Sequence, residues 1–419
     1  MKYQINAFIP FPGINKGRAS YRRLIHLFLI ILLHLIFLTG CTGSNTEKTS
    51  ALKEDSAQES VADLYPEKVT IKYAKRFNVH YFNTYKVITV FNPYENKADT
   101  LTYLLLGRNA EIPKGYEHSQ IVRIPVQRMA LFSTTHVGLI EMLGAEDMIA
   151  GISDPKYLHS RKIHEMMKQG KTIEVGLVFN PNLEALLAIN PDLLMISVLS
   201  ASQLLKFQAL MKANIPIIVN ADWLESSPLG RAEWVKMMAA LLDKEAEANK
   251  KFSEIEASYE ALSDLTKNVK NRPSVLLGLP YKDSWFMSAG KSYMVQLLKD
   301  AGASYHWESD SATGGLKLNF EKVYPVALEA EYWLNQGKVD SREELLSKDP
   351  RFADFKAFKN GNLYNNTKLL NEHEGNAYWE IGITNPHIVL ADLIKIFHPE
   401  LSDSSVLKAH PMTFYKKID

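Results

Sequence analysis

Acidic and histidine side chains lie close together at two places in the sequence, and both places could supply ligands to a metal ion. His164 and the glutamate after it match the first two residues of the His-Glu-x-x-His motif of zinc proteases, but Lys168 occupies the position of the second histidine. The other close cluster is the Glu-His-Glu stretch Glu372–Glu374. A dedicated zinc or manganese site needs three or four converging ligands, which neither stretch provides by itself. We therefore predict no metal site.

The motifs of common enzyme sites are absent from the sequence. It contains no Gly-x-Ser-x-Gly turn, no Gly-x-x-x-x-Gly-Lys phosphate loop and no Gly-x-Gly-x-x-Gly dinucleotide motif. A Ser/His/Asp triad that uses Ser133 or His136 stays open, because such triads have no fixed spacing. The formal net charge of +1, from 48 basic and 47 acidic residues, gives no electrostatic reason for nucleic-acid binding. We predict a protein without enzymatic activity, cofactor or nucleic-acid partner.

Several aromatic side chains and one arginine stand in segments that we expect to be loops, where they would form a binding surface. Aromatic rings offer flat apolar area, and a guanidinium binds an anionic group through two parallel hydrogen bonds. The candidate ligand contacts are Trp223, Arg231, Tyr281, Trp285, Tyr293 and Trp379. The alternatives are ordinary core packing for each ring and an ion pair of the arginine with Glu225 or Glu233.

The only cysteine, Cys41, follows a segment typical of an exported protein. Basic residues precede the apolar run Leu24–Leu38, and the small residues Thr39 and Gly40 come next. The run is marginal in length for a membrane-spanning helix, although an uncleaved anchor helix or a buried core helix remain alternatives. Leu38–Cys41 resembles the lipobox of bacterial lipoproteins, which implies that Cys41 carries a lipid. Residues 1–40 would then be the signal peptide and residues 41–64 a flexible, polar tether.

Short apolar stretches alternate with helical patterns over the rest of the chain. After two strand-like segments, Val69–Tyr73 and Lys86–Val90, the predicted strands are Ile121–Val126, Met148–Ile152, Leu193–Ser197, Pro216–Val219, Ser274–Leu279, Trp285–Ser288, Tyr332–Asn335 and Asn362–Asn365. Helices are predicted near His136–Leu143, Leu183–Ile189 and Ser202–Ala213. Such alternation predicts an α/β fold with mostly parallel sheets covered on both faces, and ligand contacts in the loops at the carboxyl ends of the strands.

A long helix separates the two series of strands. Apolar residues recur at three- and four-residue spacing between Asp243 and Asn268, on one helix face. Ser227 is a good N-cap for the helix before it, because Pro228 follows at the first turn. We predict an N-terminal lobe at residues 65–227 with extra strands, a helical linker at 228–271 and a C-terminal lobe at 272–419.

Several stretches resemble the substrate-binding proteins of ABC importers for iron–siderophore complexes, haem and cobalamin. In chain order they are Met148–Ser153, Pro181–Leu194, Asn214–Ile218, Glu225–Trp234, Ser288–Tyr293, Asp300–Ala303 and Leu390–Ile394. The resemblance covers roughly residues 121–415, and its strength lies in the order of the stretches together with the lipobox. It implies a class III periplasmic-binding-protein-like fold, in which a single long α-helix joins the two lobes.

The resemblance also implies partners. In this family an acidic residue at the tip of each lobe pairs with arginines of a dimeric permease, and Glu184 and Glu321 match by motif and by equivalent place. The alternative role for both is stabilisation of a helix N-terminus. The implied protein is a monomeric lipoprotein on the periplasmic side of the inner membrane, with the outer membrane as an alternative, that delivers an iron chelate, haem or cobalamin. A free metal ion as cargo, or a signalling or surface role, are the other readings.

Overall fold

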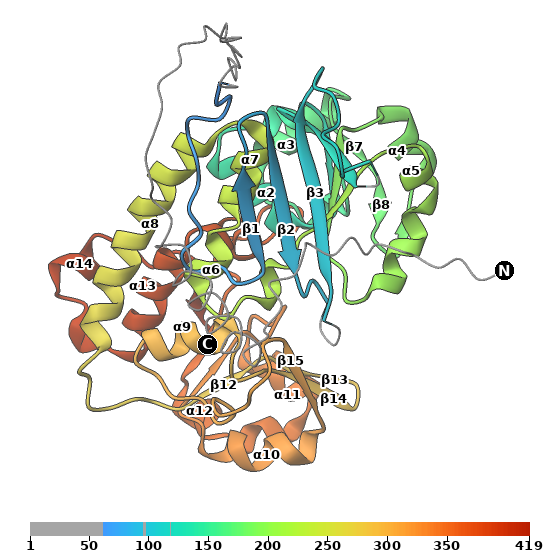
Figure 1. Ribbon diagram of the computed structural model, residues 1–419. Helices are drawn as coiled ribbons and strands as arrows, with labels where there is room; N and C mark the ends of the chain where they lie inside the picture. Colours follow the sequence, from blue (N-terminus) through green and yellow to red (C-terminus); the bar gives the residue numbers. More distant parts are fainter. Residues whose placement is uncertain (1–61, 95–97, 118) are drawn as a thin grey trace, which may run out of the picture. The chain divides into compact units, whose positions relative to one another are not determined.

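A five-stranded parallel sheet forms the first half of the computed structural model, which describes residues 62–94, 98–117 and 119–419 (Figure 1). Its order is β11-β10-β5-β6-β7, with bounds Ile217–Val219, Leu193–Ile196, Met129–Leu131, Ile149–Ile152 and Ile173–Glu174. The edge strand β11 and the three central strands are buried along their length, as expected for a parallel sheet covered on both faces. The strand order reverses between β5 and β10, and ligands of open α/β sheets bind at such a switch point.

Helices cover both faces of this sheet, and their first residues explain where they begin. The helical elements are α2 (Thr134–Met142), α3 (Arg161–Lys168), α4 (Leu183–Ile189), η3 (Ala201–Phe207) and α5 (Gln208–Lys212). Ser133 caps α2 by accepting a hydrogen bond from the Thr135 amide, and Asn182 caps α4 by accepting one from the Ala185 amide at 3.1 Å. The short hairpin of β8 (Gly176–Leu177) and β9 (Asn180–Pro181) precedes α4.

A second sheet of four strands precedes the parallel one. It consists of β1 (Phe77–Tyr81), β2 (Tyr85–Phe91), β3 (Thr100–Gly107) and β4 (Gln120–Ile124), antiparallel except for the parallel pair β3–β4. The prediction of a strand at Val69–Tyr73 is wrong. That segment has no strand partner, because the Glu233 carboxylate accepts hydrogen bonds from the amides of Lys72, Tyr73 and Ala74. The backbone groups that a sheet would pair are satisfied by a side chain instead.

The predicted long helix is α8 (Glu245–Thr266), 22 residues in length. It follows α6 (Pro228–Ala232) and α7 (Val235–Leu242), and Ser227 caps α6 at the Gly230 amide, as predicted. Asp243 ends α7 in a left-handed conformation with φ of 54°. The chain passes through α8 before the second series of strands begins, and its role as the rigid link between two lobes stays a prediction.

The second half is built on a sheet of β12 (Val275–Leu277), β16 (Tyr332–Leu334), β17 (Leu363–Asn365) and β18 (Lys416–Lys417). The first three strands are parallel, and β18 is antiparallel to β17. A three-stranded antiparallel sheet of β13 (Pro280–Tyr281), β14 (Ser284–Ser288) and β15 (Gly315–Leu318) follows β12. The helical elements here are α9 (Tyr293–Asp300), α10 (Phe320–Glu329), α11 (Arg342–Lys348), η5 (Pro350–Asp354) and α12 (Lys356–Asn360). The predicted α/β fold with parallel sheets is confirmed.

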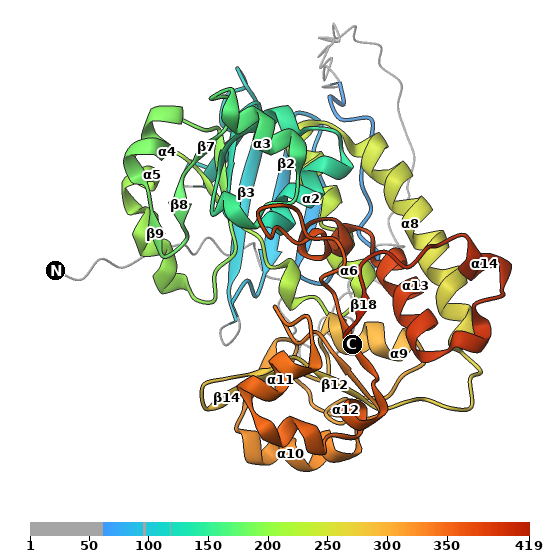
Figure 2. The same cartoon turned by 180° about the vertical axis from the view of Figure 1, so that it is seen from behind.

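The C-terminal segment contacts both halves of the protein. It contains the π-helical turn η6 (Tyr378–Gly382), α13 (Pro386–Phe397) and α14 (Ser405–Lys408), and α13 packs along α8 while η6 packs on α2 (Figure 2). The approach of η6 is so close that a methyl group on Gly138 would overlap the carbonyl oxygen of Glu380. One continuous hydrophobic core therefore includes Leu131, Leu262 and Trp333, from the first sheet, α8 and the second sheet.

Candidate functional site

The loops at the carboxyl ends of the two sheets meet each other. Leu158 and His159 follow β6, and Asn371 and Glu380 follow β17. The Asn371 side-chain amide donates to the Leu158 carbonyl at 2.7 Å, and the His159 amide donates to the Glu380 carboxylate at 2.7 Å. Ligand sites in α/β proteins lie outside the carboxyl ends of the strands. These contacts therefore place the carboxyl-end loops of the two sheets, where a ligand is expected to bind, next to each other.

A second junction forms around Arg231, one of the predicted ligand contacts. Its guanidinium lies over the ring of Tyr293, 4.3 Å from the centroid, and its Nε donates to Asp222 at 2.7 Å. The alternative considered from the sequence, an ion pair with Glu225 or Glu233, does not form, because both carboxylates bind backbone amides of residues 72–76. Nη1 of Arg231 is buried without a hydrogen-bond partner. The surrounding space of about 20 Å³ fits one water molecule and no organic ligand.

About half of the exposed large apolar side chains of the described residues follow the carboxyl ends of parallel strands. They are Tyr157 after β6, Leu199 after β10, Tyr281 and Phe286 after β12, and Leu369, Leu370 and Trp379 after β17. Trp379 is 43% exposed and Tyr281 67% exposed, as a ligand contact requires. These two were among the ligand contacts predicted from the sequence, whereas Tyr157 and Phe286 were not.

The structure favours the packing alternative for Trp285. The side chain is fully buried, its Nε1 donates to the Leu277 carbonyl at 2.9 Å, and its ring lies among those of Phe320, Trp333, Phe352 and Phe355. Trp223, in the short helical turn Asp222–Leu224, is half-buried against the core. Of the six predicted ligand contacts, Tyr281 and Trp379 therefore present the most open surface.

Glu184 and Glu321 occupy equivalent positions on two helices. Each is exposed in the first turn, two residues after an asparagine N-cap. The Asn319 side chain accepts a hydrogen bond from the Lys322 amide at 3.1 Å, as the Asn182 side chain does from the Ala185 amide. A carboxylate in this place stabilises a helix N-terminus by about 0.3–1 kcal/mol and leaves its outer oxygens open to a partner.

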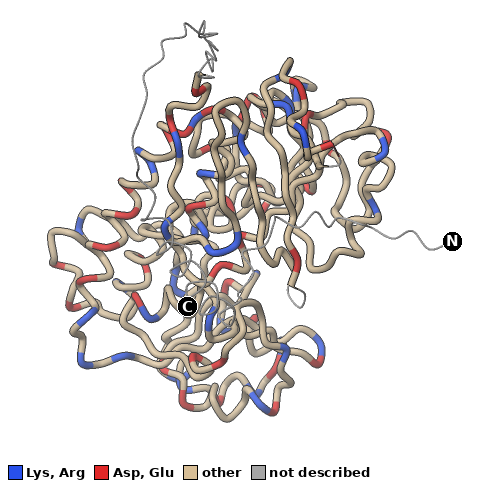
Figure 3. Tube along the Cα trace, viewed as in Figure 1, with Lys and Arg blue, Asp and Glu red and all other residues tan. Residues whose placement is uncertain are grey.

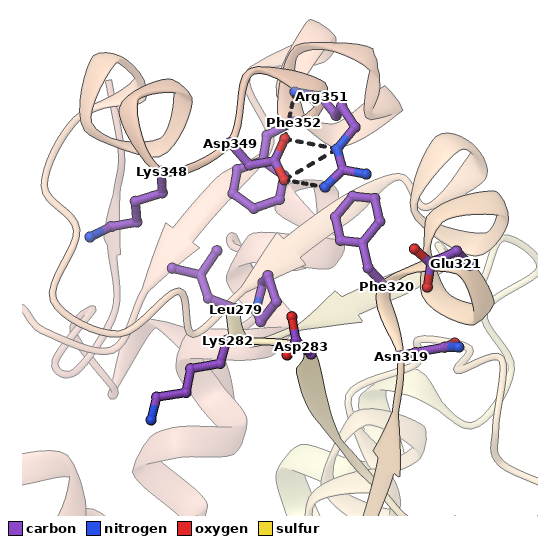
Figure 4. Close-up of a pocket in the computed structure, with 11 residues that line it drawn as sticks. Leu279, Lys282, Asp283, Asn319, Phe320, Glu321, Lys348, Asp349, Arg351 and Phe352 are labelled. Carbon is purple, nitrogen blue, oxygen red and sulfur yellow. Dashed lines mark hydrogen bonds and ion pairs between the residues drawn. The ribbon is translucent and has the colours of Figure 1, made fainter.

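A hollow of about 450 Å³ lies beside Glu321 (Figure 4). The turn at Lys282 and Asp283, the start of α10 and the segment Lys348–Phe352 form its walls. Arg351 stacks on Phe320, 3.8 Å from the ring centroid, and pairs with Asp349 at 2.7 Å. The wall therefore carries charges of both signs, and Figure 3 shows the same mixture of acidic and basic residues along the coloured, described part of the trace.

His136 lies at the switch point between β5 and β10 and is fully buried. Burial lowers the pKa of its imidazole to about 4, so the ring is neutral at pH 7. Its Nε2 lies 3.1 Å from the Ser197 hydroxyl rather than near Ser133, and Asp222 is held by Arg231. The structure therefore does not assemble a triad from Ser133, His136 and an aspartate.

The Glu-His-Glu stretch of residues 372–374 does not converge on one point. His373 lies 3.5 Å from the Glu372 carboxylate and beside His164, with ring centroids 5.1 Å apart, whereas Glu374 pairs with Lys338. In the described part of the chain no three His, Cys, Asp or Glu side chains converge as a metal site would require. Cys41 lies outside the described residues. Within those residues, every helix is too short or too polar to cross a bilayer.

Comparison with known proteins identifies relatives over nearly the whole chain. Two uncharacterized lipoproteins of Methanocaldococcus jannaschii are 25% and 24% identical, covering 90% and 91% of this chain and 94% and 96% of their own. Two solved structures share the fold. A possible iron-binding periplasmic protein of Staphylococcus epidermidis has TM-score 0.50 at 16% identity, covering 65% of this chain and 99% of its own. The molybdate-bound MolA of Haemophilus influenzae has TM-score 0.52 at 14% identity, covering 68% and 90%.

The family match covers the elements that carry the candidate site. The model of the periplasmic binding proteins matches residues 130–368, from β5 through β17, and so includes both carboxyl-end loop sets up to Lys368. This family consists of binding proteins rather than enzymes, which agrees with the motifs absent from the sequence. The match also confirms the family predicted from the sequence. The chain belongs to the periplasmic binding protein family.

Proposed function

We propose that this protein is an extracytoplasmic lipoprotein that captures a small molecule and delivers it to the permease of an ABC importer. The observation that supports it most is that the loops at the carboxyl ends of both sheets touch each other and are followed or accompanied by exposed aromatic side chains such as Tyr157 and Trp379. Flat apolar surface with a few placed polar groups is what binding sites for organic ligands provide. The proposed cargo is an iron chelate such as a siderophore, haem or cobalamin.

Attachment to the membrane would come from a lipid on Cys41, with the protein on the periplasmic side of the inner membrane. The polar segment Thr42–Asp63 gives the folded part a tether. The curated relatives that match along the chain are lipoproteins by name, which supports this attachment. Cys41→Ser should release the protein from the membrane fraction, and retention of the variant there would contradict the lipid anchor.

Delivery would use Glu184 and Glu321 as contacts for arginines of the dimeric permease. Both carboxylates are exposed at helix starts, in the two halves of the protein. The binding protein would act as a monomer and place its ligand loops over the permease entrance. Contacts of the C-terminal segment with both halves favour a largely preformed site, whose affinity does not require large motion.

The test is titration of tryptophan fluorescence of the full-length protein with haemin, ferric siderophores, cobalamin, molybdate and bare divalent metals. Trp379 is a suitable reporter because it is exposed on a candidate ligand loop, and Trp379→Phe is the control that removes the signal while keeping a ring. Saturable binding of one chelate in the micromolar range supports the proposal. Binding of bare metal alone supports the metal-ion alternative, and flat titrations throughout contradict the cargo class and favour a signalling or surface role.

A further inference from the structure

The three-stranded sheet β13–β15 buries one face and exposes the other. In β14, Trp285 and Met287 point into the core, so Phe286 between them points outward and is 59% exposed. The same alternation continues on β15, where Leu316 and Leu318 are half-buried. The register is consistent, because Trp285 pairs with Leu318 on the inner face.

A second aromatic ring lies on this outer face. Tyr281 pairs with Ser284, which has the same orientation as Phe286 two residues later. Such a diagonal pair on neighbouring strands lies roughly 7–8 Å apart, within reach of two aromatic side chains. Both rings are more than half exposed, so neither is used in packing. The two exposed rings lie on the same face of the sheet, which we call the hairpin platform and define by Tyr281 and Phe286.

Two lysines flank the hairpin platform. Lys317 pairs directly across from Phe286, and the Lys282 ammonium lies 5.4 Å from the centre of the Tyr281 ring. Across the described residues, neither lysine forms an ion pair with a carboxylate. Lys282 adopts φ of 53° in the turn between β13 and β14, a conformation that favours glycine or asparagine. The turn thus holds a charged side chain beside the rings at a position where glycine would be less strained.

The hairpin platform belongs to the carboxyl-end region of the second sheet. β13 follows β12 after a short connection, and β14 leads to Ser292 and α9, whose Tyr293 lies under Arg231. The loop before β15 also touches the first half, because Arg76 donates to the Thr313 hydroxyl at 3.2 Å. The inner face of the sheet packs on α10 and η5 through Trp285, so the rings face away from those helices.

We propose that the hairpin platform is a binding subsite for flat conjugated rings that carry negative charge, such as a porphyrin with carboxylates or a catecholate. The rings would stack on Phe286 and Tyr281, and the anionic groups would meet the ammonium groups of Lys317 and Lys282. Stacking on aromatic faces favours flat ligands, and unpaired cations beside them select anions. The inference rests on the proposed function, since it assigns a ligand class to the proposed carrier and four residues that would contact that ligand.

The test measures affinities of purified full-length protein for haemin, a ferric tris-catecholate, cobalamin and molybdate. Phe286→Ala should weaken haemin or catecholate binding by tenfold or more. Lys317→Glu should weaken the same ligands more strongly at low than at high salt, and Lys317→Arg should restore most of the affinity. The matched control is Phe179→Ala, which removes an aromatic ring that is 65% exposed on the β8–β9 turn and should leave affinity unchanged.

The outcomes separate this inference from the proposed function. If the wild type binds a flat chelate and Phe286→Ala and Lys317→Glu bind it with unchanged affinity, the hairpin platform is not the subsite. The proposed carrier function is then unaffected. Wild-type protein that binds only cobalamin overturns the assigned ligand class alone, whereas binding of molybdate alone contradicts the proposed cargo as well. If none of the probes binds, both the platform and the proposed cargo are contradicted.

Discussion

The carboxyl group of Glu380 lies where the C-terminal segment meets α2, fully buried, and its Oε1 has no hydrogen-bond partner. Burial, with a further contribution from the charge of Glu141, raises the pKa of Glu380 to about 8. The amides of His159 and Ser160 partly oppose this shift by donating hydrogen bonds to the carboxylate. At neutral pH the group is mostly protonated.

This raised pKa predicts a pH dependence of stability. The unfolded chain ionises Glu380 near its ordinary value of 4.5, whereas the folded protein does so near 8. The free energy of unfolding therefore falls as pH rises between these two values and is constant above them. Between pH 5 and pH 8.5 the wild type should lose on the order of 2–4 kcal/mol more than Glu380→Gln, as measured by urea unfolding.

The comparison with Glu380→Gln isolates this group, because all other titrating residues are present in both proteins. Glu372→Gln is the matched control, since the Glu372 side chain is 84% exposed. It should have the same pH dependence as the wild type. Equal pH dependence of the wild type and Glu380→Gln would show that Glu380 ionises normally in the folded protein.

Gly138 permits the close approach of η6 to α2. An added methyl group would overlap the Glu380 carbonyl oxygen, so backbone must move to admit it. Gly138→Ala should destabilise the protein by about 1–3 kcal/mol in urea unfolding, despite the better helix propensity of alanine. The control is Gly107→Ala, whose methyl would meet only the Ala110 side chain at 3.9 Å. Equal stability of Gly138→Ala and wild type would mean that η6 is not held against α2.

At the scale of elements, Lys86 connects the N-terminal sheet to the junction of α7 and α8. The side chain is fully buried, and its ammonium lies 2.6 Å from both the Asp243 and the Glu245 carboxylates. Removing the cation leaves the buried Glu245 without its counter-charge. Lys86→Met should therefore cost about 3–5 kcal/mol of unfolding free energy, measured in urea.

Two further variants test whether the cost comes from the unpaired charge. Glu245→Gln added to Lys86→Met should recover part of the loss, because it removes the uncompensated anion. Lys68→Met should cost less than about 1 kcal/mol, because the Lys68–Asp63 pair is exposed. A loss for Lys68→Met as large as that for Lys86→Met would contradict the role of burial.

Elements defined by local signals were predictable from the sequence. α4 has the predicted bounds Leu183–Ile189, since its N-cap and apolar spacing lie within a few residues of each other. The conformation of residues 69–73 was not predictable from the sequence, because the carboxylate that binds their backbone belongs to Glu233, about 160 positions away. β14 shows a third case. Neighbouring side chains of a strand face opposite sides of the sheet, so a strand at Trp285–Ser288 places Trp285 and Phe286 on different faces. Which of the two is buried depends on packing against Phe320 and Phe352, which the sequence does not show.

For the whole molecule, the proposed docking contacts can be tested without touching the ligand site. Glu184→Arg with Glu321→Arg should abolish uptake of the cargo, because like charges would then meet across the permease interface. Ligand affinity should stay at the wild-type value in Glu184→Arg, because Glu184 lies on α4 in the other half of the protein from the hairpin platform. Glu321 lines the same hollow as Lys282, so affinity is measured for each single variant as well as for the pair. The measurements are transport in cells and fluorescence titration of the purified variant.

The matched control for this experiment is Glu343→Arg with Glu344→Arg, two first-turn acidic residues of α11 that have no proposed docking role. Uptake should persist in this variant if its fold is intact. Unchanged uptake in the Glu184/Glu321 variant would contradict the docking role and leave helix stabilisation as the function of both carboxylates.

The packing of η6 against α2 also affects the order in which the chain folds. A polypeptide that emerges from its N-terminus presents Gly138 long before Glu380, yet the surface of α2 at Gly138 packs against that late segment. This face of α2 therefore stays uncovered until more than half of the chain has followed it, with slow, long-range closure as the last step. A chain that cannot finish folding until its end is free is well suited to passing through a membrane pore unfolded.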